Sequence, residues 1–85
     1  MHIWISLMAG GPQDGQRFTR EFYTPRTVPP AMRASDGQVC CPVAMRAAAK
    51  AAVCVVVHPH ARPEEIERAI DAMVAATEGE AISGK

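Results

Sequence analysis

The sequence predicts an α+β domain in which a small, mainly antiparallel sheet carries two helices on one face. Three observations favour this fold class. The β-branched run AAVCVVVHPH, residues Ala51–His60, is typical of a central strand. A glycine-rich turn near the N-terminus separates two segments that read as the strands of a hairpin. Pro42 and Pro63 each precede a stretch of helix-forming residues, and proline favours the first position of a helix.

The first predicted element is an N-terminal hairpin. Residues 2–9 alternate, with aliphatic side chains at every second position from Ile3 and with Trp4 on the opposite face. We expect the aliphatic face to point inward and the face of Trp4 to be partly covered. The turn at Gly10–Gly15 leads into a second strand over residues 16–24.

A proline-rich connector follows this hairpin. In Thr24–Pro30, TPRTVPP, the prolines lack amide donors and bias the preceding residues toward extended backbone. This segment is therefore neither a helix nor a central strand. Residues 31–37 are predicted to form a turn, and residues 38–41 a short strand.

A first helix is predicted over Val43–Ala52. Its residues are strong helix formers, and its only charged side chains, Arg46 and Lys50, form one stripe at a spacing of four. The small side chains elsewhere would let this helix lie close to the sheet. Ala51–Val57 either extends the helix or forms a strand. The strand is favoured because β-branched residues lose rotamer freedom in a helix.

A second helix is predicted to begin at Pro63, with acidic residues near the positive end of its dipole. Gly79 is expected to end it, which gives one domain over residues 1–78 and a flexible tail over residues 79–85. The period of the apolar residues predicts a buried face made of Ile66, Ala69, Ile70, Met73, Val74 and Thr77.

Composition narrows the class of protein. Hydrophobic residues make up 48% of the 85 residues, which is too many for a disordered chain. No run approaches the roughly 18 apolar residues of a membrane span, and no basic segment opens the chain as in a signal peptide. The three cysteines, Cys40, Cys41 and Cys54, are an odd number with an adjacent pair, so we expect reduced thiols and a cytoplasmic protein.

The charges divide the chain into two parts. Residues 1–62 hold seven basic and three acidic residues, a net charge of +4, whereas residues 63–85 hold two basic and six acidic residues, a net charge of −4. This division favours a protein that binds a protein partner or forms a homodimer, although it is also explained by one solvated acidic helix. The predicted partner-binding residues are Arg17, Arg20, Arg26, Arg33, Tyr23, Glu64, Glu67 and Asp71.

Nucleic-acid binding by the same arginines is the alternative hypothesis, because arginines interleaved with aromatic residues can contact phosphates and stack on bases. Two features weigh against it. The chain has no net charge, and it contains no helix-turn-helix or RNP pattern.

A zinc or thiol chemistry is a further alternative. Cys54, His58 and His60 have the right ligand types for zinc, but the simpler interpretation is a buried cysteine followed by surface histidines at a strand end. Cys41 at a helix N-terminus would have a lowered pKa, with His58 or His60 as a base. No spacing supports either site, so we expect no enzyme, no metal and no cofactor.

The stretch WISLMAGGPQDGQRFTREFYTPRTVPPAM, about the first third of the chain, resembles the start of small uncharacterised proteins encoded by bacteriophages and mobile elements. The resemblance implies a short, non-catalytic protein that acts by binding, either in a virion or against a host factor. Inhibitors of host defence nucleases, such as anti-CRISPR proteins, are one such class. Residues Cys40–Lys85 are not covered by the resemblance, which carries over no functional residue.

Overall fold

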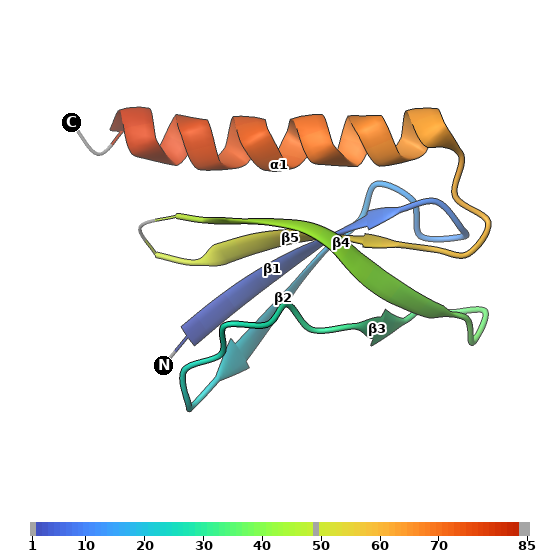
Figure 1. Cartoon of the computed structure of the whole chain (residues 1–85), viewed down its shortest axis with the longest axis horizontal. Coiled ribbons are helices and arrows are strands. Elements are labelled where there is room, and N and C mark those ends of the chain that lie inside the picture. Colours follow the sequence, from blue (N-terminus) through green and yellow to red (C-terminus); the bar gives the residue numbers. More distant parts are fainter. Residues whose placement is uncertain (1, 49, 84–85) are drawn as a thin grey trace.

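The five strands form one curled, mixed sheet, a half-barrel with a single helix on one face (Figure 1). The computed structural model describes the backbone of residues 2–48 and 50–83 and the side chains as far as residue 78. The sheet has the order β2-β1-β5-β4-β3, in which β1 and β5 are parallel and the other neighbours are antiparallel. The elements are β1 (His2–Ala9), β2 (Arg17–Phe22), β3 (Met32–Arg33), β4 (Val39–Ala47), β5 (Ala52–Val57) and α1 (Pro63–Ser83).

The predicted fold class was wrong, since the sheet is mixed and α1 is the only helix in the described residues. The segment Val43–Ala52, expected to be a helix, instead holds the second half of β4, which ends at Ala47, and the first residue of β5, Ala52. These strands form a hairpin in which the amide of Ala48 donates to the carbonyl of Ala51, 2.8 Å away. Helix propensity is a weak preference, and pairing with the β-branched strand β5 overrides it here.

Of the other predictions for this part of the chain, some are confirmed and some are wrong. The prediction that the β-branched run is a strand is confirmed by β5. The short strand expected over residues 38–41 begins at Val39 and continues to Ala47. Pro42 does not start a helix; it lies within β4, where the register shifts between Pro42 and Ala44. Such a bulge is one of the few places where a strand accepts proline.

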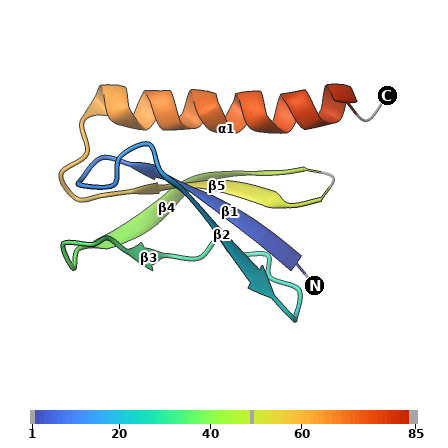
Figure 2. The same ribbon diagram turned by 180° about the vertical axis from the view of Figure 1, so that it is seen from behind.

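The core lies on both faces of the sheet, as the alternation in β1 predicted. Leu7, Ala9, Val53 and Val55 pack against α1, and the residues between them in sequence face the other way. That second face is covered by the chain between β2 and β4, which runs beneath the sheet (Figures 1 and 2). Its buried cluster consists of Trp4, Met8, Ala34, Cys40, Cys54 and Val56.

Helix α1 begins as predicted. The Glu65 side chain accepts a 2.8 Å hydrogen bond from the amide of Arg62, the residue before Pro63, as in half of a capping box. The predicted buried face is confirmed, and Thr77 satisfies its buried hydroxyl by donating to the carbonyl of Met73. The helix passes Gly79, where we expected its end, and continues to Ser83.

Residues 84–85 of the predicted tail lie outside the described residues. Among the residues that the structure describes, no helix has both the length and the apolar character needed to cross a membrane.

The turn after β1 packs tightly on the loop after β5. Gly10, Gly11 and Gly15 all have positive φ, at 82°, 75° and 84°. A side chain at Gly11 would also overlap the imidazole ring of His58, whereas the space around Gly15 is open. Gly11 therefore serves both the backbone conformation and a close approach, and Gly15 serves only the conformation.

Replacing these glycines by alanine should separate the two effects. Gly15→Ala is expected to lower the free energy of unfolding by about 1–2 kcal/mol, the cost of a left-handed alanine. Gly11→Ala should cost about 1–3 kcal/mol more, because the new methyl group displaces the His58 ring. Urea unfolding of both variants measures the difference, and equal losses would contradict the close packing of Gly11 on His58.

Candidate functional site

Two predicted partner-binding arginines meet over one aromatic ring. Arg20 and Phe22 point to the same face of β2, and Arg26 reaches back from the connector. The guanidinium carbons of Arg20 and Arg26 lie 5.2 Å and 5.0 Å from the centre of the Phe22 ring. Each such contact contributes about 0.5–1 kcal/mol when exposed, enough to bias the orientation of both side chains.

Backbone contacts and neighbours shape this surface further. The Nε of Arg26 donates to the carbonyl of Val28 at 2.8 Å, which orients its guanidinium. Tyr23, next to Phe22, is 89% exposed. Among the described residues the two ion pairs are His58–Asp36 and Arg68–Asp14, so neither arginine meets a carboxylate. We call Arg20, Phe22, Tyr23 and Arg26 the arginine surface.

The other two predicted arginines lie elsewhere. Arg17 pairs with Leu7 across the hairpin and therefore points to the α1 side of the sheet. Arg33 lies on β3, at the opposite edge, and donates to the carbonyl of Gly37 at 2.7 Å. The four arginines are thus not one continuous surface, and only Arg20 and Arg26 are brought together.

The predicted acidic residues lie across the molecule from the arginine surface. Glu64, Glu67 and Asp71 are exposed on α1. Helix α1 covers one face of the sheet and the connector with Arg26 runs along the other, so the sheet separates the two charged surfaces (Figure 1). A single flat partner therefore cannot contact both surfaces at once.

His58 is a buried structural residue, not the surface histidine expected from the sequence. Its side chain is 2% exposed, and its Nδ1 accepts a 3.1 Å bond from the amide of His60. The ring proton is therefore on Nε2, which donates to Asp36 at 2.8 Å. Because both nitrogens are occupied within the protein, His58 has no free lone pair for a metal or a substrate proton.

The cysteines do not assemble into a site with the histidines. Cys54 is buried on β5 beside Ser6, with a distance of 3.4 Å between Sγ and Oγ, and His60 is exposed. Within the described residues no three metal-binding side chains cluster. Cys41 lies in β4 and is exposed, so the helix N-terminus that was expected to activate it is absent there.

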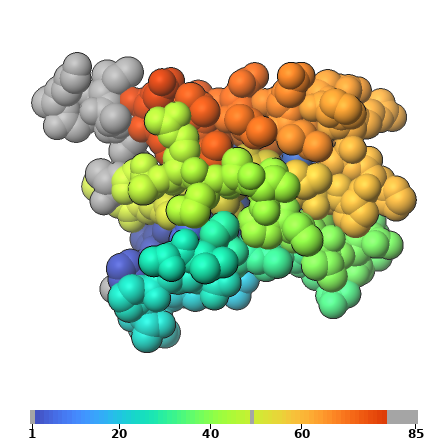
Figure 3. All heavy atoms as spheres, viewed as in Figure 1, coloured from blue at the N-terminus to red at the C-terminus, as the bar shows by residue number. Residues whose placement is uncertain are grey.

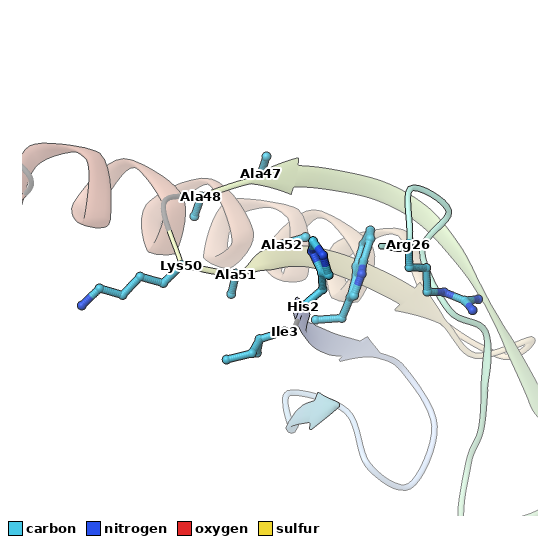
Figure 4. Close-up of a pocket in the computed structure, with 9 residues that line it drawn as sticks. His2, Ile3, Arg26, Ala47, Ala48, Lys50, Ala51 and Ala52 are labelled. Atoms are coloured by element: carbon cyan, nitrogen blue, oxygen red, sulfur yellow. The ribbon is translucent and has the colours of Figure 1, made fainter. Parts of the chain in front are cut away.

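A hollow of about 300 Å³ lies beside the N-terminal end of β1 (Figure 4). Its lining includes His2, Trp4, Arg26 and Lys50 together with alanines of the β4–β5 hairpin. In Figure 4 the side chains of Arg26 and Lys50 extend away from His2 in opposite directions. The charged groups therefore do not converge on one point, as an enclosed anion site would require.

Comparisons with protein-family models, with curated proteins and with solved structures found no match for this chain.

The thiols should differ sharply in reactivity. Burial raises the pKa of Cys40 and of Cys54, whereas Cys41 is exposed. We expect iodoacetamide to alkylate Cys41 rapidly in the native protein and the other two only as the protein opens, as followed by mass spectrometry. Cys41→Ser should remove the rapid reaction, and rapid labelling of Cys54 would contradict the described packing of β5.

Asp36 should make stability depend on pH in the acid range. Hydrogen bonds from the Gln38 amide and from His58 lower the pKa of this carboxyl below its ordinary value of about 3.9. Its contribution is complete above the unfolded-state pKa and is lost as the pH falls through the lower folded-state pKa. Asp36→Asn should therefore flatten the loss of stability in urea between about pH 5 and pH 2. Parallel curves for the two proteins would exclude this role.

Proposed function

We propose that this protein is a small, non-catalytic binding module whose arginine surface recognises an acidic segment of a partner protein. The observation that carries the proposal is the pair of guanidinium groups over Phe22, with no carboxylate partner among the described residues. Guanidinium groups bind carboxylates through paired hydrogen bonds, and holding them in place reduces the entropy lost on binding.

Two further features support binding in preference to catalysis. Both ring nitrogens of His58 are engaged inside the protein, and Cys40 and Cys54 are buried. Tyr23, which follows Phe22 in the sequence, provides an exposed aromatic group of the kind that is enriched in protein interfaces. The resemblance of the N-terminal third to phage-encoded proteins is the reason to look for the partner among host factors.

Charge reversal tests the proposal with a defined probe, a fluorescent peptide of alternating aspartate and glutamate. The double variant Arg20→Glu and Arg26→Glu should weaken binding at least tenfold in fluorescence anisotropy, because both contacts become repulsive. Arg17→Glu is the matched control: the charge change per residue is the same, on the same strand, but on the α1 side of the sheet. A loss of binding free energy in the control that is half the loss in the double variant would show that only net charge matters, and an unchanged double variant would refute the proposal.

The same measurement tests nucleic-acid binding, which Arg20, Arg26 and the exposed ring of Tyr23 would also permit. Single-stranded DNA of matching length replaces the peptide. Tighter binding to DNA that falls steeply with salt and is weakened by Tyr23→Ala would favour this second function, since base stacking contributes about 1–3 kcal/mol per base.

A further inference from the structure

The outer edge of β4 is open along most of its length. Strand β3 pairs with Val39 and Cys40 only, and β5 occupies the inner side from Cys41 to Ala47. No described strand lies on the outer side of this seven-residue segment. In the space-filling view β4, green to yellow-green, crosses the front of the molecule between α1 and the connector (Figure 3).

Hydrogen bonding indicates which groups of β4 point outward. The amide of Ala48 donates to Ala51 and so faces β5. Because hydrogen-bonding directions alternate along an antiparallel strand, Arg46 and Ala44 also face β5, while Met45 and Ala47 direct their amides and carbonyls outward. Among the described residues, neither Met45 nor Ala47 takes part in a backbone hydrogen bond with a turn or a loop.

The side chains of this edge are apolar. Val43 and Met45 of the open segment are 57% and 41% exposed, and they are two of the five exposed large hydrophobic residues among those that the structure describes. Arg46 is the only charged residue of β4. The other open edge, β2, carries two arginines and a glutamate, the kind of charge that discourages pairing. In β4, Pro42 and the adjacent bulge discourage pairing with another strand, but only along the first half of β4.

We propose that Val43–Ala47 of β4 pairs antiparallel with the same segment of a second copy, about a two-fold axis at Met45. In this register the outward amide and carbonyl of each Met45 bond to those of its copy. Val43 lies opposite Ala47, and Arg46 lies opposite Ala44. A register centred on Arg46 would place like charges directly opposite each other, which is destabilising.

Charge also argues for a second copy as the occupant. Arg46 points to the same side of the sheet as α1, because it pairs with Val53 of the α1 cluster. In the dimer it faces the side on which the second copy carries its own α1. The exposed charges of that helix are mainly acidic, with Glu64, Glu67, Asp71 and Glu78 against Arg68. The pairing is independent of the arginine surface, whose strand β2 is at the other edge.

The two-fold axis gives a sharp test by cross-linking. In a Cys41→Ser background, Met45→Cys places two thiols on residues whose Cα atoms are about 5.5 Å apart, within reach of a disulfide. Ala47→Cys is the matched control, because the two copies of residue 47 would lie roughly 13 Å apart along the strands. Mild oxidation should give a covalent dimer for Met45→Cys and not for Ala47→Cys, as seen on a non-reducing gel.

Sedimentation equilibrium of the unmodified protein provides the second measurement. We expect a monomer–dimer equilibrium, which Met45→Lys weakens about tenfold or more by opposing two charges at the axis. Thr19→Lys adds the same charge at an exposed position of β2 and should leave the equilibrium unchanged. Circular dichroism checks that both variants are folded.

Three results would overturn the proposal. The protein remains a monomer as its concentration rises, the two cysteine variants cross-link equally, or a dimer persists unchanged in Met45→Lys. If a different protein occupies this edge, the isolated chain would remain a monomer, which is the first of these results.

Discussion

The parallel pairing of β1 with β5 is the constraint on which the rest of the structure depends. Both strands carry apolar residues on both faces, so each face must be covered for the pair to be stable in water. Helix α1 covers one face, and the chain between β2 and β4 covers the other (Figure 1). Met32 and Ala34, which follow the proline-rich connector, are therefore part of the core on this face.

The parallel pair also explains the hydrogen-bonded cluster around His58. Parallel strands end at the same edge of a sheet, so the glycine turn after β1 meets the loop after β5. His58 lies between them, and its bond to Asp36 adds the turn between β3 and β4. Three loops distant in sequence are thereby held by one imidazole. The same bonds that make it a good structural residue make it unavailable for chemistry.

The sheet separates the functions that we propose. The acidic residues of α1 and the arginine surface lie on opposite sides of it, and the open edge of β4 lies at a third position. A dimer formed through β4 leaves both arginine surfaces at the outer parts of the joined sheet. Two identical binding surfaces on one particle increase the avidity for a partner that carries repeated acidic segments.

The sequence by itself determined the elements whose residues have one strong local preference. Alternation in β1, the β-branched run of β5, the glycine turn and the apolar face of α1 all follow from period and residue type. That Arg20 and Arg26 bind a partner stays a prediction from the sequence, and their meeting over Phe22 depends on how the connector folds back.

Only the tertiary structure decided that Val43–Ala47 is a strand and not a helix. Alanine and methionine favour a helix in isolation, yet this segment is a strand because β5 pairs with it from Ala44 to Ala47. The open edge of β4 could not be predicted from the sequence either, because a strand is an edge only if no other strand pairs with it in the folded sheet. The pairing of His58 with Asp36, 22 residues apart, was equally a product of strand order. Local sequence determines what a segment prefers, and the available partners decide what it becomes.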